Sequence, residues 1–478
     1  MTVTVSNSAH RSAEEIGRTT AGPRPLPPLG STREVPLPEV LDVTLATGLR
    51  VLVARNPSVP MAELRLRVPF GPDATETEGP DSDAAVSRHL AAAELLTATL
   101  LTGTATRDRV AIDDELAGVG ADLGVSVDPE RLQIGGSGLS AGLPTILDVL
   151  ADVLTGAVHP DAEVVRERSR LVERITVARA QPRTIAREAL QRKRFGTHPI
   201  AREMPTGPDV AAVQPADVRA LHAAGLVPGG AILTLVGDID PHDAVALVEQ
   251  RLGGWTAPHP ARRLTAPPPV APSNLELVPR AGSVQSQLRM SAPALPRLDA
   301  RYAALQLANL VFGGYFSSRW MENVREDKGY TYGAHSGTEF VPGGAVLSVE
   351  TDVASDVTAA ALLETRYELG RMVAVPPTAD EIDAARRYAV GSLLISLDSQ
   401  GGYASTLTSL AADAVSVQWL RDHPARLEAV TVEDVTAAAG EFFAPSAFTG
   451  VIVGDAEANR LLRRPYRAPW IHPDPKTV

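Results

Sequence analysis

The chain has 478 residues, of which 44% are hydrophobic and 21% are charged. This composition excludes disorder over most of the chain, and the length predicts two or three domains. The net charge of −12 disfavours nucleic acid as a partner, because binding phosphates needs a basic surface. There is no cysteine, which excludes disulfides, thiolate metal sites and cysteine nucleophiles.

The first residues are expected to form a tail. Residues 1–35 are polar, and the proline-rich run at 23–28 favours an extended conformation over packing. They contain no apolar segment of the kind found in secretory signals. No apolar stretch approaches the length of about 20 residues that a membrane span needs. We therefore expect a disordered or extended tail, a cytoplasmic protein and no membrane partner.

The pattern that follows mixes strands and helices. Alternation predicts strands at 49–55, 61–68, 130–139 and 231–237, and helical periodicity predicts helices at 91–101, 110–120, 143–154, 161–180 and 216–224. The first two strands follow each other without a helix between them. This order favours a largely antiparallel sheet with helices packed on it, an α+β fold, over a doubly wound nucleotide-binding fold.

Residues 256–274 have the composition of a proline-rich linker, and the two parts they separate are related. Val-Gly-Asp follows an apolar strand in both parts, with Gly237 in the first and Gly454 in the second. The same offset of 217 pairs Asp217 with Asp434. We interpret this register as a tandem duplication, with one domain at 36–255 and its repeat at 275–478.

Common catalytic motifs are absent. The chain contains no G-x-G-x-x-G, G-x-S-x-G, H-E-x-x-H or H-x-x-E-H. His89 and Glu94 come closest to a metal-ligand pair, but five residues correspond to about 140° around a helix, so their side chains would diverge. We interpret His89 as a surface or helix-end histidine.

The most informative segment is residues 307–337, LANLVFGGYFSSRWMENVREDKGYTYGAHSG. We expect a helix that runs into Gly313, a second helix that carries Arg325, and a turn at Gly329 that leads to a strand. Arg325 and Tyr332 would then meet at the corner between helix and strand. A guanidinium and a phenol at one corner could donate hydrogen bonds to peptide carbonyls.

This segment closely resembles the C-terminal domain of the pitrilysin family, in particular its half-size bacterial members of the mitochondrial processing peptidase type. The turn FGTHP at 195–199, the duplicated halves and the linker extend the resemblance over both parts of the chain. The resemblance implies two similar α+β domains that enclose a peptide chamber. It also implies a zinc motif, H-x-x-E-H with a distant Glu, in the first domain, and substrate binding by Arg325 and Tyr332 in the second.

The sequence departs from the family at the zinc motif. Alignment on Gly103 puts Glu94, Thr97 and Ala98 at the positions of the first histidine, the glutamate and the second histidine, and alignment on Pro182 puts Arg174 at the third ligand. All three ligands and the base are replaced. We therefore expect no metal or cofactor in this chain and no hydrolytic activity of the chain alone.

The family includes heterodimers in which one chain has lost the zinc motif, and this chain resembles that kind. The leading hypothesis is a non-catalytic, substrate-binding subunit of a zinc-dependent endopeptidase that cleaves peptides. Zinc would be bound by a homologous partner subunit, and Arg325 and Tyr332 would act in trans. Two alternatives remain: a structural or peptide-binding protein with no peptidase partner, and a peptidase with a different metal site assembled by folding.

Overall fold

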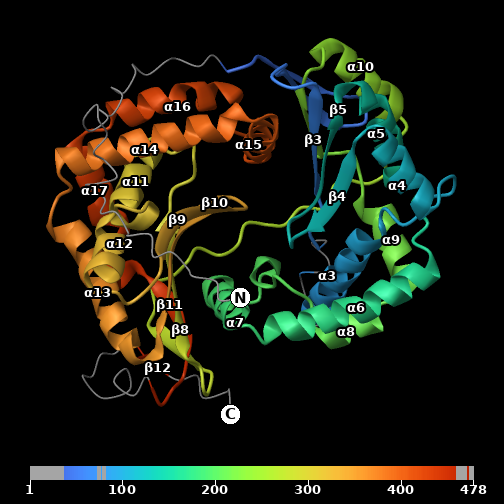
Figure 1. The fold of residues 1–478 in the computed structure, drawn as a ribbon. Coiled ribbons are helices and arrows are strands. Elements are labelled where there is room, and N and C mark those ends of the chain that lie inside the picture. The colour runs from blue at the N-terminus through green and yellow to red at the C-terminus, as the bar shows by residue number, and fades with distance from the viewer. Residues whose placement is uncertain (1–36, 73–76, 78–81, 459–470, 473–478) are drawn as a thin grey trace, which may run out of the picture. The chain divides into compact units, whose positions relative to one another are not determined.

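The computed structural model describes residues 37–72, 77, 82–458 and 471–472. The tail expected at 1–35 lies outside these residues. The described residues from Pro38 onward belong to one compact unit with two six-stranded sheets (Figure 1). Its helices and two mixed sheets confirm the expected α+β class. Among the described residues, no helix is long and apolar enough to cross a membrane.

The first sheet has the strand order β1-β2-β6-β3-β5-β4. β2 and β6 run parallel, and every other neighbouring pair is antiparallel. Its strands are β1 (Val40–Thr44), β2 (Arg50–Arg55), β3 (Met61–Pro69), β4 (Asp122–Val127), β5 (Arg131–Leu139) and β6 (Ile232–Gly237). Burial in β5 alternates residue by residue, as expected for a strand with one face in the core. β4 was not expected from the sequence; it is an edge strand whose residues are at most half-buried.

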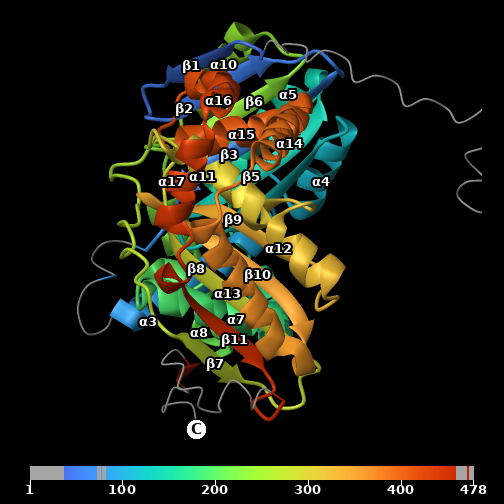
Figure 2. The same cartoon turned by 90° about the vertical axis from the view of Figure 1, so that its left-hand side faces the viewer.

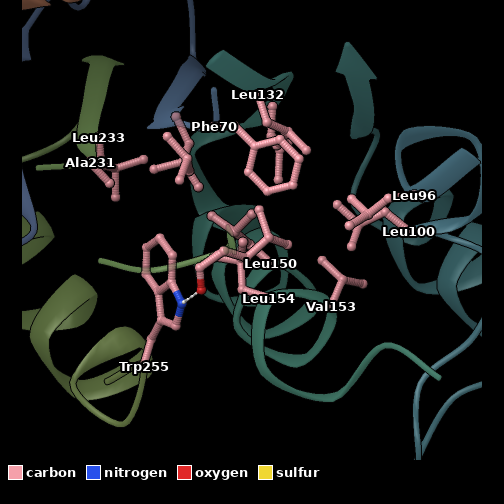
Figure 3. Close-up of a cluster of buried hydrophobic side chains, with 14 of the residues drawn as sticks. Phe70, Leu96, Leu100, Leu132, Leu150, Val153, Leu154, Ala231, Leu233 and Trp255 are labelled. Carbon is pink, nitrogen blue, oxygen red and sulfur yellow. Dashed lines mark hydrogen bonds between the residues drawn. The ribbon is translucent and has the colours of Figure 1, made fainter. Parts of the chain in front are cut away.

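The helices of the first half pack their apolar faces around a core in which Phe70, Leu132, Leu150 and Trp255 meet (Figure 3). The indole of Trp255 donates a hydrogen bond of 2.9 Å to the carbonyl of Leu226, so its polar atom is satisfied. These helices are α3 (Ser82–Thr99), α4 (Arg109–Gly118), α5 (Leu143–Gly156), α6 (Asp161–Arg179), α7 (Pro182–Phe195), α8 (Gly207–Ala212), α9 (Pro215–Gly225) and α10 (Pro241–Leu252).

The second sheet has the strand order β12-β7-β11-β8-β10-β9. Its strands are β7 (Leu275–Pro279), β8 (Gln285–Ala294), β9 (Ala334–Val341), β10 (Gly344–Ala354), β11 (Thr449–Gly454) and β12 (Ile471–His472). The helices of this half are α11 (Tyr302–Asn309), α12 (Arg319–Met321), α13 (Thr358–Ala374), α14 (Ala379–Asp398), α15 (Gln400–Ala412), α16 (Val417–Ala429) and α17 (Val432–Phe442). Two π-helical segments, η3 (Leu310–Gly314) and η4 (Glu322–Asp327), flank α12.

Five strands of each half repeat one topology, whereas the outer strands differ, because β1 is antiparallel to β2 and β12 is parallel to β7. β6 and β11, which end at Gly237 and Gly454, are both third in their sheets, parallel to one neighbour and antiparallel to the other. Asp217 and Asp434 also hold equivalent places, because each carboxylate caps its helix from the third position. Asp217 accepts from the Gln214 amide at 2.8 Å, and Asp434 accepts from the Thr431 amide at 3.0 Å. The offset of 217 residues is therefore present in the fold.

Each half packs one of its helices against the sheet of the other half. α7 contacts β8 and β11 of the second sheet, and α15 contacts β3 and β6 of the first sheet (Figure 2). On the α15 side, the Thr408 hydroxyl donates to the Thr234 hydroxyl at 2.8 Å. On the α7 side, the Arg194 guanidinium pairs with Glu339 at 2.9 Å. These contacts join the two halves beyond the segment 256–274, which the structure describes in full and which contains no helix or strand.

Candidate functional site

The helix α3 carries the positions of the degenerate zinc motif. Glu94, Thr97 and Ala98 are half-buried, while Leu95 and Leu96 between them are in the core. The Thr97 hydroxyl donates to the carbonyl of Ala93 at 2.8 Å, one turn earlier in the same helix. A neutral hydroxyl is far less basic than a carboxylate, so Thr97 cannot replace the glutamate as a general base.

α6 packs against α3 and brings Arg174 within electrostatic reach of Glu94. Burial raises the pKa of the Glu94 carboxyl, and the positive charge of Arg174 partly opposes this effect. Two of the four positions that the sequence alignment assigned thus interact in the structure, although they are eighty residues apart in the chain. The alignment itself stays a prediction.

These four positions do not fit a zinc ion. Glu94 offers one carboxylate, but Ala98 has no donor atom and Arg174 is a cation that would repel the metal. Within the described ranges there is no group of three or more His, Asp or Glu side chains that could hold a metal ion.

The sequence interpretation of His89 was wrong. His89 lies inside α3 and is only 5% exposed, in a part of the helix where Leu90 and Ala91 are buried as well. Its Nε2 is 2.8 Å from the carbonyl oxygen of Phe70, and its ring lies 5.8 Å from the Phe70 ring. The histidine joins α3 to the end of β3.

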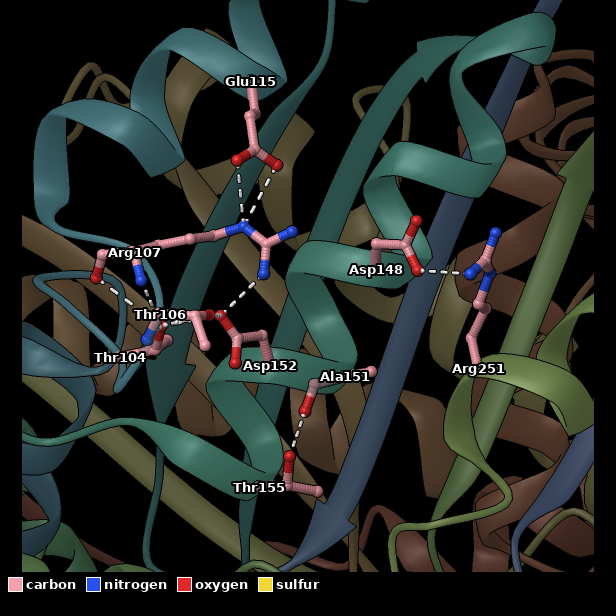
Figure 4. A network of polar contacts seen from close by, with 9 residues as sticks. All are labelled: Thr104, Thr106, Arg107, Glu115, Asp148, Ala151, Asp152, Thr155 and Arg251. Atoms are coloured by element: carbon pink, nitrogen blue, oxygen red, sulfur yellow. Dashed lines mark hydrogen bonds and ion pairs between the residues drawn. The ribbon is translucent and has the colours of Figure 1, made fainter.

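A polar cluster fixes the turn that follows α3 (Figure 4). Thr104 and Thr106 donate to Oδ2 of Asp152 on α5 at 2.6 and 2.8 Å, and Arg107 donates to the same oxygen at 2.7 Å. Arg107 also reaches Glu115 on α4. Burial raises the pKa of Asp152, but the three hydrogen bonds outweigh burial and lower it overall. The carboxylate therefore stays ionised and holds the end of α3 against α5.

The second candidate region is the segment with Arg325 and Tyr332. A helix carries Arg325 as expected, although the residue lies in the π-helical segment η4 that follows α12. Tyr332 lies in the loop before β9 and is 95% exposed. No hydrogen bond joins these two described residues. The Arg325 guanidinium instead pairs with Glu326 at 2.9 Å and stacks over the Phe316 ring, 4.4 Å from its centroid.

Tyr332 lines a cavity of about 770 Å³, and Arg325 does not. Phe316 lines the same cavity and so connects Arg325 to it. The wall also contains Tyr315 and Tyr388, whose rings lie 5.1 Å apart. Sequence reasoning missed these three aromatic residues. Their signal was available, because aromatic residues are only 4% of the chain and two of the three are adjacent.

Buried polar contacts hold this segment in place. The Arg319 guanidinium forms two bonds of 2.6 and 2.8 Å with Glu381 on α14, and it lowers the pKa of Glu381 to about 2. Asn323 donates to Glu364 and Glu368 on α13 at 3.0 and 2.8 Å. Arg319 begins α12 and Asn323 follows it in η4, so these contacts hold both ends of the turn that leads to Arg325.

Gly313 allows the close packing of this segment on β9. A Cβ atom at this position would lie 2.9 Å from both the Ser336 hydroxyl and the Trp320 ring. The Trp320 indole in turn donates to Thr365 on α13 at 3.1 Å. Gly313, at the end of the helix expected from the sequence, therefore has a packing role.

Comparison with known proteins places both regions in one family. Residues 89–206 match the model described as insulinase (peptidase family M16), and residues 212–388 match the model described as peptidase M16 inactive domain. The chain is 25% identical over 435 residues to an uncharacterized zinc protease of Streptomyces coelicolor, covering 88% of this chain and 92% of the relative. It is 24% identical over 436 residues to an uncharacterized zinc protease of Mycobacterium tuberculosis, covering 89% and 95%.

Solved structures share the fold. A peptidase M16 inactive domain from Pseudomonas fluorescens superposes with a TM-score of 0.76 at 25% identity, over 87% of this chain and 98% of that one. A protease from Helicobacter pylori superposes with a TM-score of 0.77 at 16% identity, over 87% and 100% of the two chains. At that lower identity the likeness concerns the fold alone.

Proposed function

Because the chain belongs to peptidase family M16, whose models match more than half of it, we propose that it is the non-catalytic, substrate-binding subunit of a heterodimeric zinc-dependent endopeptidase that cleaves peptides. In this proposal a homologous subunit with an intact H-x-x-E-H motif binds the zinc ion. That zinc ion would polarise the peptide carbonyl and the attacking water.

One observation carries the proposal: the positions aligned with zinc ligands no longer form a metal site, while the aligned substrate-binding tyrosine remains accessible. Arg174 brings a positive charge towards Glu94, where a metal would need an anion. Tyr332 is 95% exposed and lines a cavity, so its hydroxyl is accessible to a ligand. Loss of one function and retention of the other is expected of a subunit that only binds.

The chemistry of the two retained residues suits peptide binding. The Tyr332 hydroxyl can donate one hydrogen bond to a carbonyl that becomes an oxyanion during hydrolysis, and such a donor is worth about 2.7–4 kcal/mol in known cases. Arg325 would bind carbonyls of the bound peptide through its free nitrogens. For this, Arg325 must leave or share its contacts with Phe316 and Glu326 when substrate enters.

The need for Arg325 to leave or share these contacts favours a second candidate function. In it the chain is a peptide-binding or structural protein with no peptidase partner. Arg325 stacks on an exposed aromatic ring and pairs with its neighbour, which is how a surface arginine with no catalytic task also behaves.

The experiment that separates the two candidates is a peptidase assay of three samples: this chain, a half-size homologue with H-x-x-E-H, and their mixture. The first place to find the homologue is the neighbouring reading frame. We expect activity of the mixture to exceed the sum of the separate chains. A homologue that is fully active alone and unaffected by this chain would favour the second candidate.

A further inference from the structure

Two adjoining cavities lie away from the region of Tyr332. They have volumes of about 1080 and 400 Å³ and share Arg67, Glu130 and Pro342 in their walls. One side is formed by the first sheet, and the other by the end of α15 and the turn between β9 and β10. Neither Arg325 nor Tyr332 lines these cavities.

The two cavities concentrate positive charge in a chain whose net charge is −12. Six arginines line them, against three acidic residues. The arginines are Arg50, Arg65, Arg67, Arg131, Arg263 and Arg297, and the acids are Asp122, Glu130 and Asp413. The smaller cavity has the higher ratio of basic to acidic wall residues, because three arginines line it and Glu130 is the one acidic residue in its described wall.

The arginines that line only the larger cavity already have acidic partners, and Arg131 pairs with Asp128 at 2.9 Å. Arg65 pairs with Glu63 at 2.8 Å and donates to backbone carbonyls of its own sheet. Arg297 pairs with Asp413 and lies 3.5 Å above the centroid of the Phe340 ring. These side chains have little capacity for a further ligand. Guanidinium nitrogens that can still donate a hydrogen bond belong to the arginines of the smaller cavity.

Arg67 is the buried cation of the smaller cavity. It is 9% exposed, and its Nη2 donates to Glu130 at 2.7 Å. Its Nε is buried and has no hydrogen-bond partner. A buried guanidinium nitrogen without an acceptor costs free energy that an added acceptor would recover.

Arg263 is the second cation of the smaller cavity, and it is exposed at the start of the connecting segment. No ion pair or hydrogen bond engages its side chain in the described structure. Its Nη2 would lie 2.7 Å from a Cβ atom at Gly230, so the absence of a side chain there leaves room for the guanidinium. Arg50 completes the set; two of its nitrogens bind Asp42 and the third is 3.4 Å from the Ala411 carbonyl.

We propose that the smaller cavity binds an oxyanion, a phosphate group or a carboxylate, between Arg67 and Arg263. The planar guanidinium of arginine suits both a phosphate and a carboxylate. Either ligand group presents two or more oxygens that accept hydrogen bonds from its paired N–H donors. The cavity has the size of a small-ligand site. Its walls come from both halves and the connecting segment, so the bound anion would contact all three.

Isothermal titration calorimetry of the full chain tests this site. The probes are inorganic phosphate and N-acetylglutamate amide at constant ionic strength and pH 7.5, to distinguish a phosphate from a peptide carboxylate. We expect saturable binding of at least one probe at one site per chain. Arg263→Gln should weaken that binding about tenfold or more, the usual effect of losing a charge-assisted hydrogen bond.

Arg192→Gln is the matched control. Arg192 is an exposed arginine on α7 that lines none of these cavities, so its replacement changes the net charge equally. It should leave binding unchanged. Arg67→Lys, which keeps the charge but removes the fork, should also weaken binding. The proposal is overturned if neither probe binds the native chain, or if Arg263→Gln and Arg192→Gln bind alike.

Discussion

The imidazole Nε2 of His159 lies 2.8 Å from Nδ1 of His222, deep in the first half of the chain. Nε2 of His222 is 2.9 Å from the Leu154 carbonyl, which can only accept, so it carries the proton and its Nδ1 accepts from His159. Nδ1 of His159 in turn is 2.8 Å from the Thr99 hydroxyl. His222 is therefore neutral in the folded protein, and burial, which lowers the pKa of His159, keeps that ring neutral as well.

This pair predicts a loss of stability in mild acid. Burial lowers the pKa of His159 from 6.5 to about 3, and the charges of His222 and Arg219 add to this; burial also lowers the pKa of His222. The unfolded chain binds these protons near pH 6.5, and the folded chain does not. The free energy of unfolding should thus fall as pH decreases from about 6.5 towards 3, by up to about 1.4 kcal/mol per pH unit for each histidine.

Urea unfolding at pH 7.5, 6.0 and 5.0 measures this slope. His222→Gln removes one of the two groups and should flatten it, whereas His242→Gln should not, because His242 lies at the first turn of α10, outside this core. An equal slope in the native chain and in His222→Gln would contradict the assignment.

The contact between α3 and α6 can be tested through the titration of Glu94. Arg174 lowers the pKa of Glu94 against the larger effect of burial. Arg174→Gln should therefore raise the pKa of Glu94 further, which carboxyl-carbon NMR would follow. Arg170→Gln, one turn away and paired with Glu167, is the control and should change nothing at Glu94. An unchanged pKa in Arg174→Gln would mean that the two side chains do not face each other.

Restoring the zinc positions provides a second test of the same geometry. We expect no stoichiometric zinc in the native chain by elemental analysis after dialysis. The combination of Glu94→His, Thr97→Glu, Ala98→His and Arg174→Glu should bind zinc, with poor activity because the groups that orient metal ligands have also changed. A triple variant that keeps Arg174 should bind zinc less well. If the folded quadruple variant binds zinc no better than the native chain, the placement of the site is wrong.

Arg319 should be essential for the stability of the second half. Its side chain is 5% exposed and binds Glu381 through two nitrogens and the Val375 carbonyl through another. Arg319→Met leaves these partners unsatisfied and should cost about 3–5 kcal/mol in urea unfolding. Arg301→Met, which breaks exposed pairs with Asp299 and Glu441, should have a much smaller effect. A loss in Arg319→Met no larger than in Arg301→Met would contradict this role.

Local patterns predicted the elements that have strong periodicity. Alternation located β3 and β5, and the repeated Val-Gly-Asp at Gly237 and Gly454 located two strands that hold equivalent places. The edge strand β4 was missed because neither of its faces is fully buried. α3 begins at Ser82, earlier than expected, since its first turns carry small and polar residues with no apolar stripe.

The site was harder to predict, because its geometry depends on contacts between distant segments. The packing of α7 and α15 against the sheet of the other half has no local signal. The π-helical turn around Arg325 is held by Asn323 through α13, some forty residues later in the chain. For that reason the sequence placed Arg325 beside Tyr332, whereas the structure stacks it on Phe316.

The most direct test of the central claim is the steady-state kinetics of the reconstituted pair with Tyr332→Phe in this chain. The substitution removes only a hydroxyl from an exposed ring, so gel filtration should show an intact complex. We predict that kcat falls by about 10²–10³-fold with little change in KM, and that Tyr367→Phe, an exposed tyrosine on α13, has no effect. An unchanged kcat for Tyr332→Phe in an intact, active complex would contradict the account.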